Sequence, residues 1–150
     1  MSAAIWGSFG LVTAMVGLLG AAVVSGRLFG VVVTGRSMEP TLRSGQTVFV
    51  LRRRPDRVRR GDVVLLVDPA IPDAYVIKRV VALAGDAAPI PAGPVPAGSP
   101  VPEEEVLLLG DNPVHSVDSR LLGGYERRHI LGVALLPRPR ARRRGSPRRR

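Results

Sequence analysis

The first 26 residues contain no charged side chain, and this feature constrains the chain more than any other. The stretch "AAIWGSFGLVTAMVGLLGAAVVS" is apolar or small almost throughout. About 20 such residues in a helix cross the roughly 30 Å hydrocarbon core of a bilayer. A secretory signal peptide usually begins with positive charge and has a shorter apolar core, and a buried core helix normally shows a polar stripe. We therefore expect residues 1–27 to form a single transmembrane anchor.

Short apolar runs separated by Gly, Pro and Asp turns follow this segment. Such runs are typical of strands, and together they indicate an all-β domain. We expect strands at residues 28–35, 46–52, 61–68, 74–83, 105–112 and 127–136. The segment 85–102 holds six prolines and is expected to be a loop or connector. The predicted fold is mainly β: one N-terminal transmembrane helix followed by a compact all-β domain at residues 28–136.

Composition excludes several kinds of site. The chain has no cysteine, so it can form neither a disulfide framework nor a thiolate metal site. Its only histidines are His115 and His129, which makes a zinc site unexpected. We therefore expect no metal and no cofactor, and any catalysis has to use Ser, Lys, Asp, Glu or His.

The net charge of +10 is unevenly distributed. The last 13 residues, 138–150, carry eight arginines and no acid, so a disordered tail is expected at 137–150. Such a tail is either simply solvated or attracted to anionic lipid headgroups. Nucleic acid is a less favoured partner, because no aromatic residue is interleaved for base stacking.

Lys78 is the only lysine, against 21 arginines. Arginine serves wherever positive charge alone is needed, but its pKa stays above about 12, whereas the pKa of a buried lysine can fall toward 6 or 7. In "AYVIKRVVAL" (74–83), two-residue alternation places Val76 and Val80 on the face of Lys78. That apolar face favours a neutral lysine able to act as a base. A strand lysine that reaches solvent is the alternative.

Ser37 lies in "GRSMEPTL" (35–42), which by itself indicates only a glycine turn that contains a serine. Three further motifs follow along the chain: "RGDVV" (60–64), "KRVVALAGD" (78–86) and "GDNPVHSVDSR" (110–120). In this order, after an apolar segment, the four motifs resemble those of the type I signal peptidases, membrane-bound serine proteases that use a Ser–Lys dyad. The resemblance covers most of residues 31–135 and implies the fold of their catalytic domain.

The resemblance implies a role for each catalytic residue. Ser37 would be the nucleophile and Lys78 its general base, with Ser116 hydrogen-bonded to Lys78 to orient it. The backbone N–H of Ser37 would be one oxyanion donor. Some relatives place a serine side chain as a second donor two residues earlier, where this chain has Gly35.

The resemblance also implies substrates and supporting residues. Val31 and Val33 fall where the family lines its pockets for small side chains. The implied structural ion pairs are Asp111 with Arg79 and Asp118 with Arg120. Substrates would be exported preproteins with small residues before the cut, of the Ala-x-Ala kind.

The implied location is the cell membrane, with a single-pass anchor in the lipid bilayer and the catalytic domain on the extracytoplasmic side. Charge counting disagrees, because Arg27, Arg36 and Arg43 follow the anchor and no basic residue precedes it. Taken literally, that count places the domain in the cytoplasm.

Other functions remain open from the sequence. Ser37, His115 and Asp118 could form a Ser-His-Asp triad. Self-cleaving repressor-type proteases share the Ser–Lys dyad but carry a DNA-binding domain where this chain has an apolar segment. A membrane-anchored, non-enzymatic β-domain could instead bind anionic lipid or nucleic acid through the arginine-rich tail.

Overall fold

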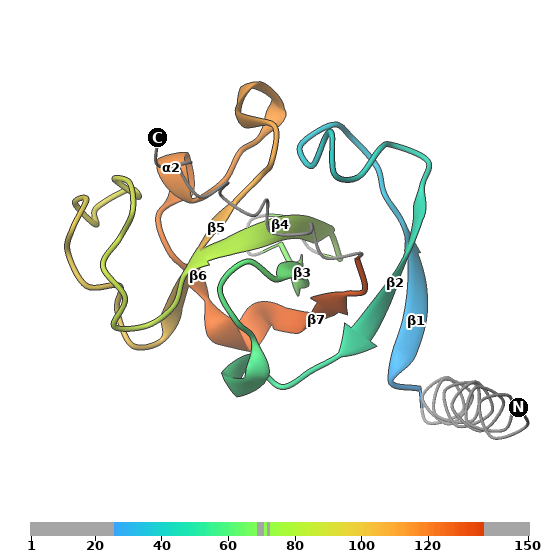
Figure 1. Cartoon of the computed structure of the whole chain (residues 1–150), viewed down its shortest axis with the longest axis horizontal. Helices are drawn as coiled ribbons and strands as arrows, with labels where there is room; N and C mark the ends of the chain where they lie inside the picture. Colours follow the sequence, from blue (N-terminus) through green and yellow to red (C-terminus); the bar gives the residue numbers. More distant parts are fainter. Residues whose placement is uncertain (1–25, 69–70, 72, 137–150) are drawn as a thin grey trace, which may run out of the picture.

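The computed structural model describes residues 26–68, 71 and 73–136 and has the mainly β fold expected from the sequence (Figure 1). Seven strands form one antiparallel sheet in the order β1-β2-β7-β3-β4-β5-β6. The strands are β1 (Leu28–Val32), β2 (Thr47–Arg52), β3 (Val63–Val67), β4 (Tyr75–Ala82), β5 (Glu105–Leu109), β6 (Tyr125–Glu126) and β7 (Ile130–Ala134). The helical turns are η1 (Pro55–Arg57), η2 (Pro113–His115), α2 (Ser119–Leu122) and η3 (Arg127–His129).

Each of the six predicted strands contains an observed one, but α2 and β6 were not predicted. α2 is only four residues long and begins at a local cap, where the Asp118 side chain accepts a hydrogen bond from the Arg120 N–H. β6 has two residues and, among the described strands, pairs only with β5. Neither element is long enough to produce a periodic pattern.

The predicted transmembrane anchor at residues 1–27 lies almost wholly outside the described residues, as does the arginine-rich tail. Within the described ranges, no helix is long and apolar enough to cross a bilayer.

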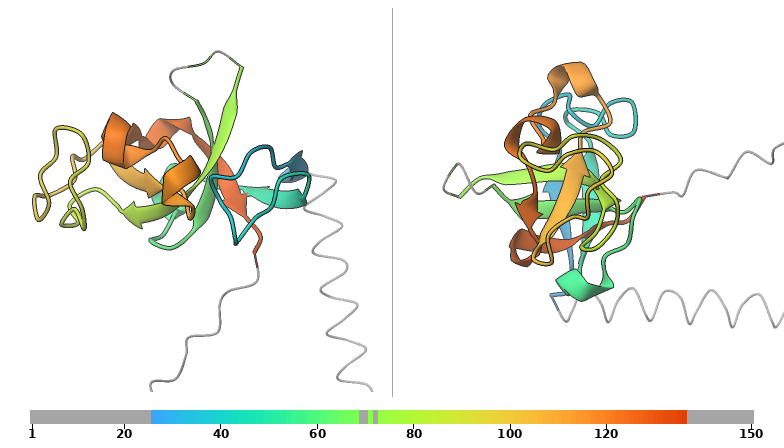
Figure 2. Two further views of the ribbon diagram at one scale, coloured as in Figure 1. Left: turned by 90° about the horizontal axis from the view of Figure 1, so that it is seen from above. Right: turned by 90° about the vertical axis from the view of Figure 1, so that its left-hand side faces the viewer.

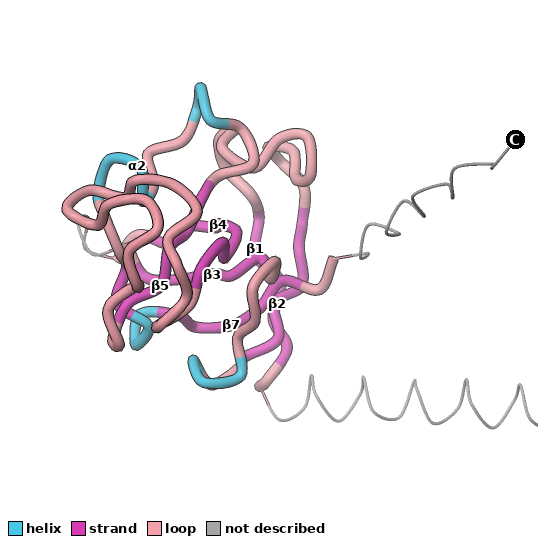
Figure 3. The backbone as a smooth tube through the Cα atoms, turned by 60° about the vertical axis from the view of Figure 1, so that its left-hand side comes forward, coloured by secondary structure: helices cyan, strands magenta, loops and turns pink. Residues whose placement is uncertain are grey.

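The curled sheet encloses two apolar clusters. Figure 3 shows the strands gathered in the middle of the domain with the loops around them. One cluster fills the space between β3, β4, β5 and β7, and includes Val64, Leu66, Val80 and Leu108. The other joins β2 and β3 to the turn that carries Ser37. The second cluster therefore fixes the position of that turn.

The proline-rich segment 85–102 is a loop, as predicted, but it is packed against the sheet by an apolar cluster of its own. The buried side chains of this cluster pack against Ala82 at the end of β4 and Leu107 in β5; they are Ala88, Ala92, Val95 and Val101. Backbone bridges join Ala87 to Pro100 and Ala92 to Val95. Figure 2 shows this segment as a separate lobe at one side of the sheet.

Gly93 lies where this lobe contacts the loop after α2. Its φ is +54°, and a Cβ atom there would stand 2.8 Å from the Gly123 Cα. We expect Gly93→Ala to lower the free energy of unfolding by about 1–3 kcal/mol, because strain and overpacking add. Thermal unfolding of the full chain in detergent measures this. Gly98→Ala is the control, since Gly98 has a φ of +83° but nothing within 4 Å; equal losses in both variants would rule out the clash.

Candidate active site

Ser37 lies on a turn after β1 that is anchored by its neighbours. Met38 and Leu42 are 2% and 0% exposed, and burial of each contributes about 1.5–3 kcal/mol. The Leu42 N–H donates to the Met38 carbonyl at 2.9 Å. On the other side, the Asn112 N–H donates to the Ser37 carbonyl at 2.9 Å. The main chain of Ser37 is thus held from both sides, while its side chain is half-buried.

Lys78 lies in the middle of β4 opposite Val64 of β3 and is 5% exposed. Val80 on the same face is buried and Val76 packs against the core, as two-residue alternation predicted. Desolvation by burial lowers the pKa of Lys78, and the charge of Arg120 lowers it further. The carboxylates of Asp118 and Asp68 act in the opposite direction without cancelling the effect. Burial therefore favours the neutral amine.

Two cavities meet at Ser37 and Lys78, since both residues line each of them. The β1–β4 cavity, of about 260 Å³, is lined by Val31, Val33 and Ile77 among others. The Tyr125 cavity, of about 410 Å³, lies against Tyr125, Val117 and Asp68. Val31 and Val33 thus contribute to the wall of the smaller cavity next to the serine.

Ser116 donates its hydroxyl proton to Asp118 Oδ2 at 2.6 Å. The resemblance implied a hydrogen bond between Ser116 and Lys78; the donor bond to Asp118 leaves the lone pairs of the Ser116 hydroxyl available for it, and that role stays a prediction. Asp118 also accepts from the Gly110 N–H at 2.9 Å and from two guanidinium nitrogens of Arg120, at 2.9 and 2.6 Å. Burial by itself raises the pKa of Asp118, but these hydrogen bonds outweigh burial and lower it to about 2. Asp118 therefore stays ionised and influences Lys78 through its charge.

Asp118 links the stability of the site to pH. Its folded pKa of about 2 is below the unfolded value near 3.9, so it contributes about 2 kcal/mol above pH 4, lost as the pH falls toward 2. We expect Asp118→Asn to reduce the free energy of unfolding at pH 7 and to flatten its decline between about pH 4 and 2. Denaturation at several pH values measures both. An unchanged acid decline in the variant would assign that decline to other carboxylates.

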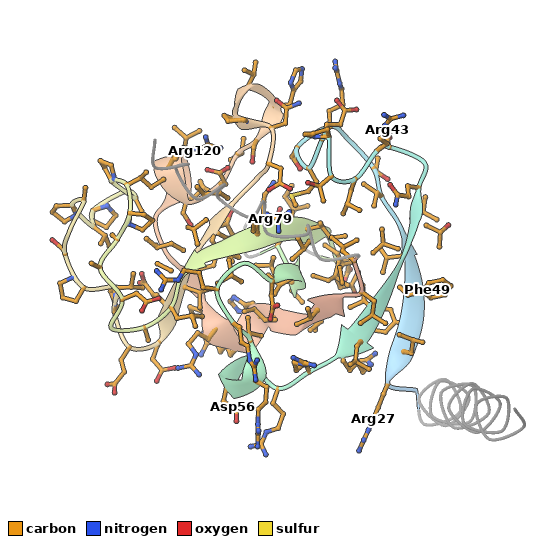
Figure 4. The ribbon with its side chains drawn as sticks, in the orientation of Figure 1. Arg27, Arg43, Phe49, Asp56, Arg79 and Arg120 are labelled. Atoms are coloured by element: carbon orange, nitrogen blue, oxygen red, sulfur yellow. The ribbon has the colours of Figure 1, made fainter. Side chains whose placement is uncertain are left out.

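A second ion pair lies beside the nucleophile turn. Arg79 Nη2 and Nε contact the Asp111 carboxylate at 2.6 and 2.8 Å (Arg79 is labelled in Figure 4). The same guanidinium donates to the Gly61 carbonyl at 2.9 Å and to the Thr41 hydroxyl at 3.4 Å. Burial alone would raise the pKa of Asp111, but hydrogen bonds from Arg79 and Thr41 hold it below its ordinary value. The pair therefore joins the Ser37 turn to β4 and the loop after β5.

Gly110 is a site residue that sequence reasoning did not single out. A Cβ atom there would lie 2.6 Å from both the Ser116 Cβ and the Ser37 carbonyl oxygen. Its lack of a side chain lets these two segments meet at the end of β5. The only sequence signal was its place at the start of "GDNPVHSVDSR".

The triad alternative finds no support from Asp118, whose hydrogen bonds go to Ser116, Gly110 and Arg120 rather than to His115. His115 itself is exposed on η2 and lines the Tyr125 cavity.

Gly35 has a φ of +90°, which L side chains rarely adopt, and its N–H donates to the Ser44 hydroxyl at 3.3 Å.

A serine on a fixed turn that lines the same cavities as a desolvated lysine defines a class of site suited to nucleophilic catalysis. Comparison with known proteins agrees with that class. The signal peptidase, peptidase S26, family matches residues 6–95 and 87–138, and the chain belongs to this family.

Similar proteins include three protease subunits of mitochondrial membranes. Mitochondrial inner membrane protease subunit 1 of Mus musculus is 38% identical over 97 residues, 62% of this chain and 58% of that protein. Mitochondrial ATP-independent inner membrane protease subunit 1a of Arabidopsis thaliana is 37% identical over 111 residues, 69% of this chain and 66% of that protein. Subunit 2 of the Mus musculus inner membrane protease is 38% identical over 98 residues, 61% of this chain and 55% of that protein. The chain thus spans little more than half the length of the two mouse proteins.

Proposed function

We propose that the chain is a membrane-anchored serine endopeptidase that removes signal peptides from exported preproteins after small residues. Ser37 is the nucleophile and Lys78 its general base. The observation that carries this proposal is the shared position of Ser37 and a desolvated Lys78 at the junction of two cavities. Membership in the signal peptidase family and similarity to membrane proteases support the same class of activity.

In this mechanism, neutral Lys78 accepts the Ser37 hydroxyl proton as the oxygen attacks the substrate carbonyl. The Ser37 backbone N–H donates to the developing oxyanion. The lysine ammonium then protonates the leaving amine, and water hydrolyses the acyl-enzyme. Because Ser116 donates its only hydroxyl proton to Asp118, it can offer Lys78 lone pairs alone. It would accept an N–H from Lys78 and leave the amine lone pair directed elsewhere, toward Ser37.

The strand edges beside the β1–β4 cavity suit an extended peptide. β1 pairs only with β2, and β4 pairs with β5 only from Arg79 onward, so residues 75–78 have one unpaired side among the described strands. A peptide can add its backbone to such edges while its alternate side chains enter a pocket. The cavity of about 260 Å³ has an apolar wall that includes Val31, Val33 and Ile77, and we propose that it receives small side chains such as alanine.

We assign residues 1–27 to the anchor, 28–136 to the catalytic domain and 137–150 to an arginine-rich tail. The anchor would hold the domain at the membrane surface, on the extracytoplasmic side, where the cleavage site of a preprotein emerges. Ser37 lies ten residues beyond Arg27, so even an extended chain reaches only about 33–36 Å past it. This short reach keeps the active site close to cleavage sites that lie near the bilayer.

The proposal is tested with the purified full chain and a preprotein that has alanine before the cut. We expect cleavage at that bond, identified by sequencing the new N-terminus, and at least about 10³-fold less with Ser37→Ala. Leucine or phenylalanine in place of that alanine should also stop cleavage. His115→Ala is the matched control and should keep most activity. Loss of activity in His115→Ala would favour the triad, and no cleavage by the wild type would favour the non-enzymatic binding domain.

A further inference from the structure

We propose that residues 52–60, which comprise the last residue of β2 and most of the loop that follows it, bind the phosphate groups of anionic lipids at the membrane surface; this segment is called the arginine-rich loop. The loop carries six arginines and one aspartate, a formal charge of +5. All six arginines are exposed. This segment is separate from the tail in the sequence and lies within the described domain.

The loop is held in a fixed shape with its arginines outward. Val58, at its centre, is 5% exposed and belongs to the main apolar cluster. The Arg59 N–H donates to Asp62 Oδ2 at 2.9 Å, and the Gly61 N–H donates to the Val80 carbonyl at 2.8 Å. Because the backbone is already ordered, binding of phosphate requires ordering of side chains only.

The positive charge of the loop is scarcely neutralised within the protein. Asp56 lies 3.7 Å from the Nε atoms of Arg54 and Arg57, beyond hydrogen-bond distance. The Arg54 and Arg57 side chains are 87% and 78% exposed. Guanidinium groups free to form paired hydrogen bonds match the oxygens of a phosphate.

The loop lies at the end of the domain where the chain arrives from its charge-free N-terminal segment. The Arg52 N–H donates to the Arg27 carbonyl at 2.6 Å, and Arg27 is the first charged residue of the sequence. The Arg52 guanidinium stands 5.0 Å from the centre of the Phe29 ring. Figure 4 places Arg27 and Asp56 at one end of the domain and Arg43 at the other. The right-hand view in Figure 2 shows the same neighbours, with η1 beside the start of β1.

This position favours lipid over nucleic acid as the occupant. A bilayer that holds the N-terminal segment would meet this end of the domain first. Each basic residue near an anionic surface adds to the attraction, and the effect decays within a Debye length. The loop itself contains no aromatic residue on which a base could stack.

The test uses the full chain in nanodiscs of zwitterionic phospholipid, with or without an anionic lipid. Nitroxide-labelled lipid serves as the quencher. Because the chain has no cysteine, a single dye can be attached through Arg57→Cys or Arg43→Cys, each of which removes one charge. We expect anionic lipid to increase quenching at position 57 and not at position 43. The increase should disappear at high salt. Equal quenching at position 57 in zwitterionic nanodiscs and in nanodiscs that contain anionic lipid would overturn the proposal.

Two charge-matched variants then distinguish the loop from the tail. Arg53, Arg54, Arg59 and Arg60 are replaced by glutamine in one, and Arg142, Arg143, Arg144 and Arg148 in the other. We expect the loop variant to reduce the anionic increase at position 57 at least about fivefold and the tail variant to keep most of it. Should the loop variant not fold, Arg53→Gln with Arg54→Gln should give a smaller loss in the same direction. If the tail variant lost most of the anionic increase and the loop variant kept it, lipid binding would be assigned to the tail. If an oligonucleotide binds the loop and lipid composition has no effect on quenching at position 57, the surface is assigned to nucleic acid.

Discussion

Lys78→Arg is expected to abolish preprotein cleavage, with kcat/KM falling at least about 10³-fold. The substitution keeps a positive charge on β4 but removes the capacity to lose a proton, since the guanidinium pKa stays above about 12. A residue that served only as a cation would tolerate the change. Cleavage assays with the purified variant measure the loss, and activity that survives Lys78→Arg would refute Lys78 as the base.

Lys78 is 5% exposed, so the larger arginine side chain can also disturb folding. Lys78→Met separates loss of the base from loss of the folded state. It is close in volume, removes the buried amine and should unfold at or above the wild-type temperature while remaining inactive. A Met variant that folds and still cleaves would contradict the assignment as strongly as an active Arg variant.

The pH profile of the wild type is a separate expectation. Only the neutral amine can act as a base, so kcat/KM should rise with pH through the pKa of Lys78. Desolvation lowers that pKa from its ordinary value of 10.5, so the rise should be centred below 10.5. A profile that stays flat or falls as the pH increases to that value would exclude a titrating lysine. Asp118, with its pKa of about 2, remains ionised across the whole range.

The strands could be predicted because each carries its own apolar, β-branched pattern. The face of Lys78 followed from the same alternation, and the structure places that residue beside buried Val80. The short α2 and β6 were missed because neither is long enough to carry a periodic pattern, and β6 forms by pairing with β5. The proline-rich segment was correctly predicted to be a loop, but its packing could not be anticipated, since its alanines and valines carry no regular period.

Some residues of the candidate site could likewise be predicted from the sequence, and others could not. Ser37 and Lys78, 41 positions apart in the sequence, stood out through a motif and through a count of lysines. The hydrogen bond from Ser116 to Asp118 was not anticipated, because it depends on the local geometry of the turn that carries both residues. Gly110 was missed for a related reason, since the requirement for glycine arises from two segments that approach it in space.

Gly110→Ala is expected to damage catalysis more than stability. A Cβ atom would intrude to 2.6 Å from the Ser37 carbonyl and from the Ser116 Cβ, so one or both segments must move. A displacement near 1 Å in an active site can lower turnover about 100-fold, while overpacking costs about 1–3 kcal/mol of folding free energy. The measurements are kcat/KM and thermal unfolding of the full chain. Gly98→Ala is the control because it adds backbone strain far from any other atom, and it should lose stability while keeping activity. Equal activity in the two variants would mean that the site accommodates a side chain at Gly110, and that its glycine does not position Ser37.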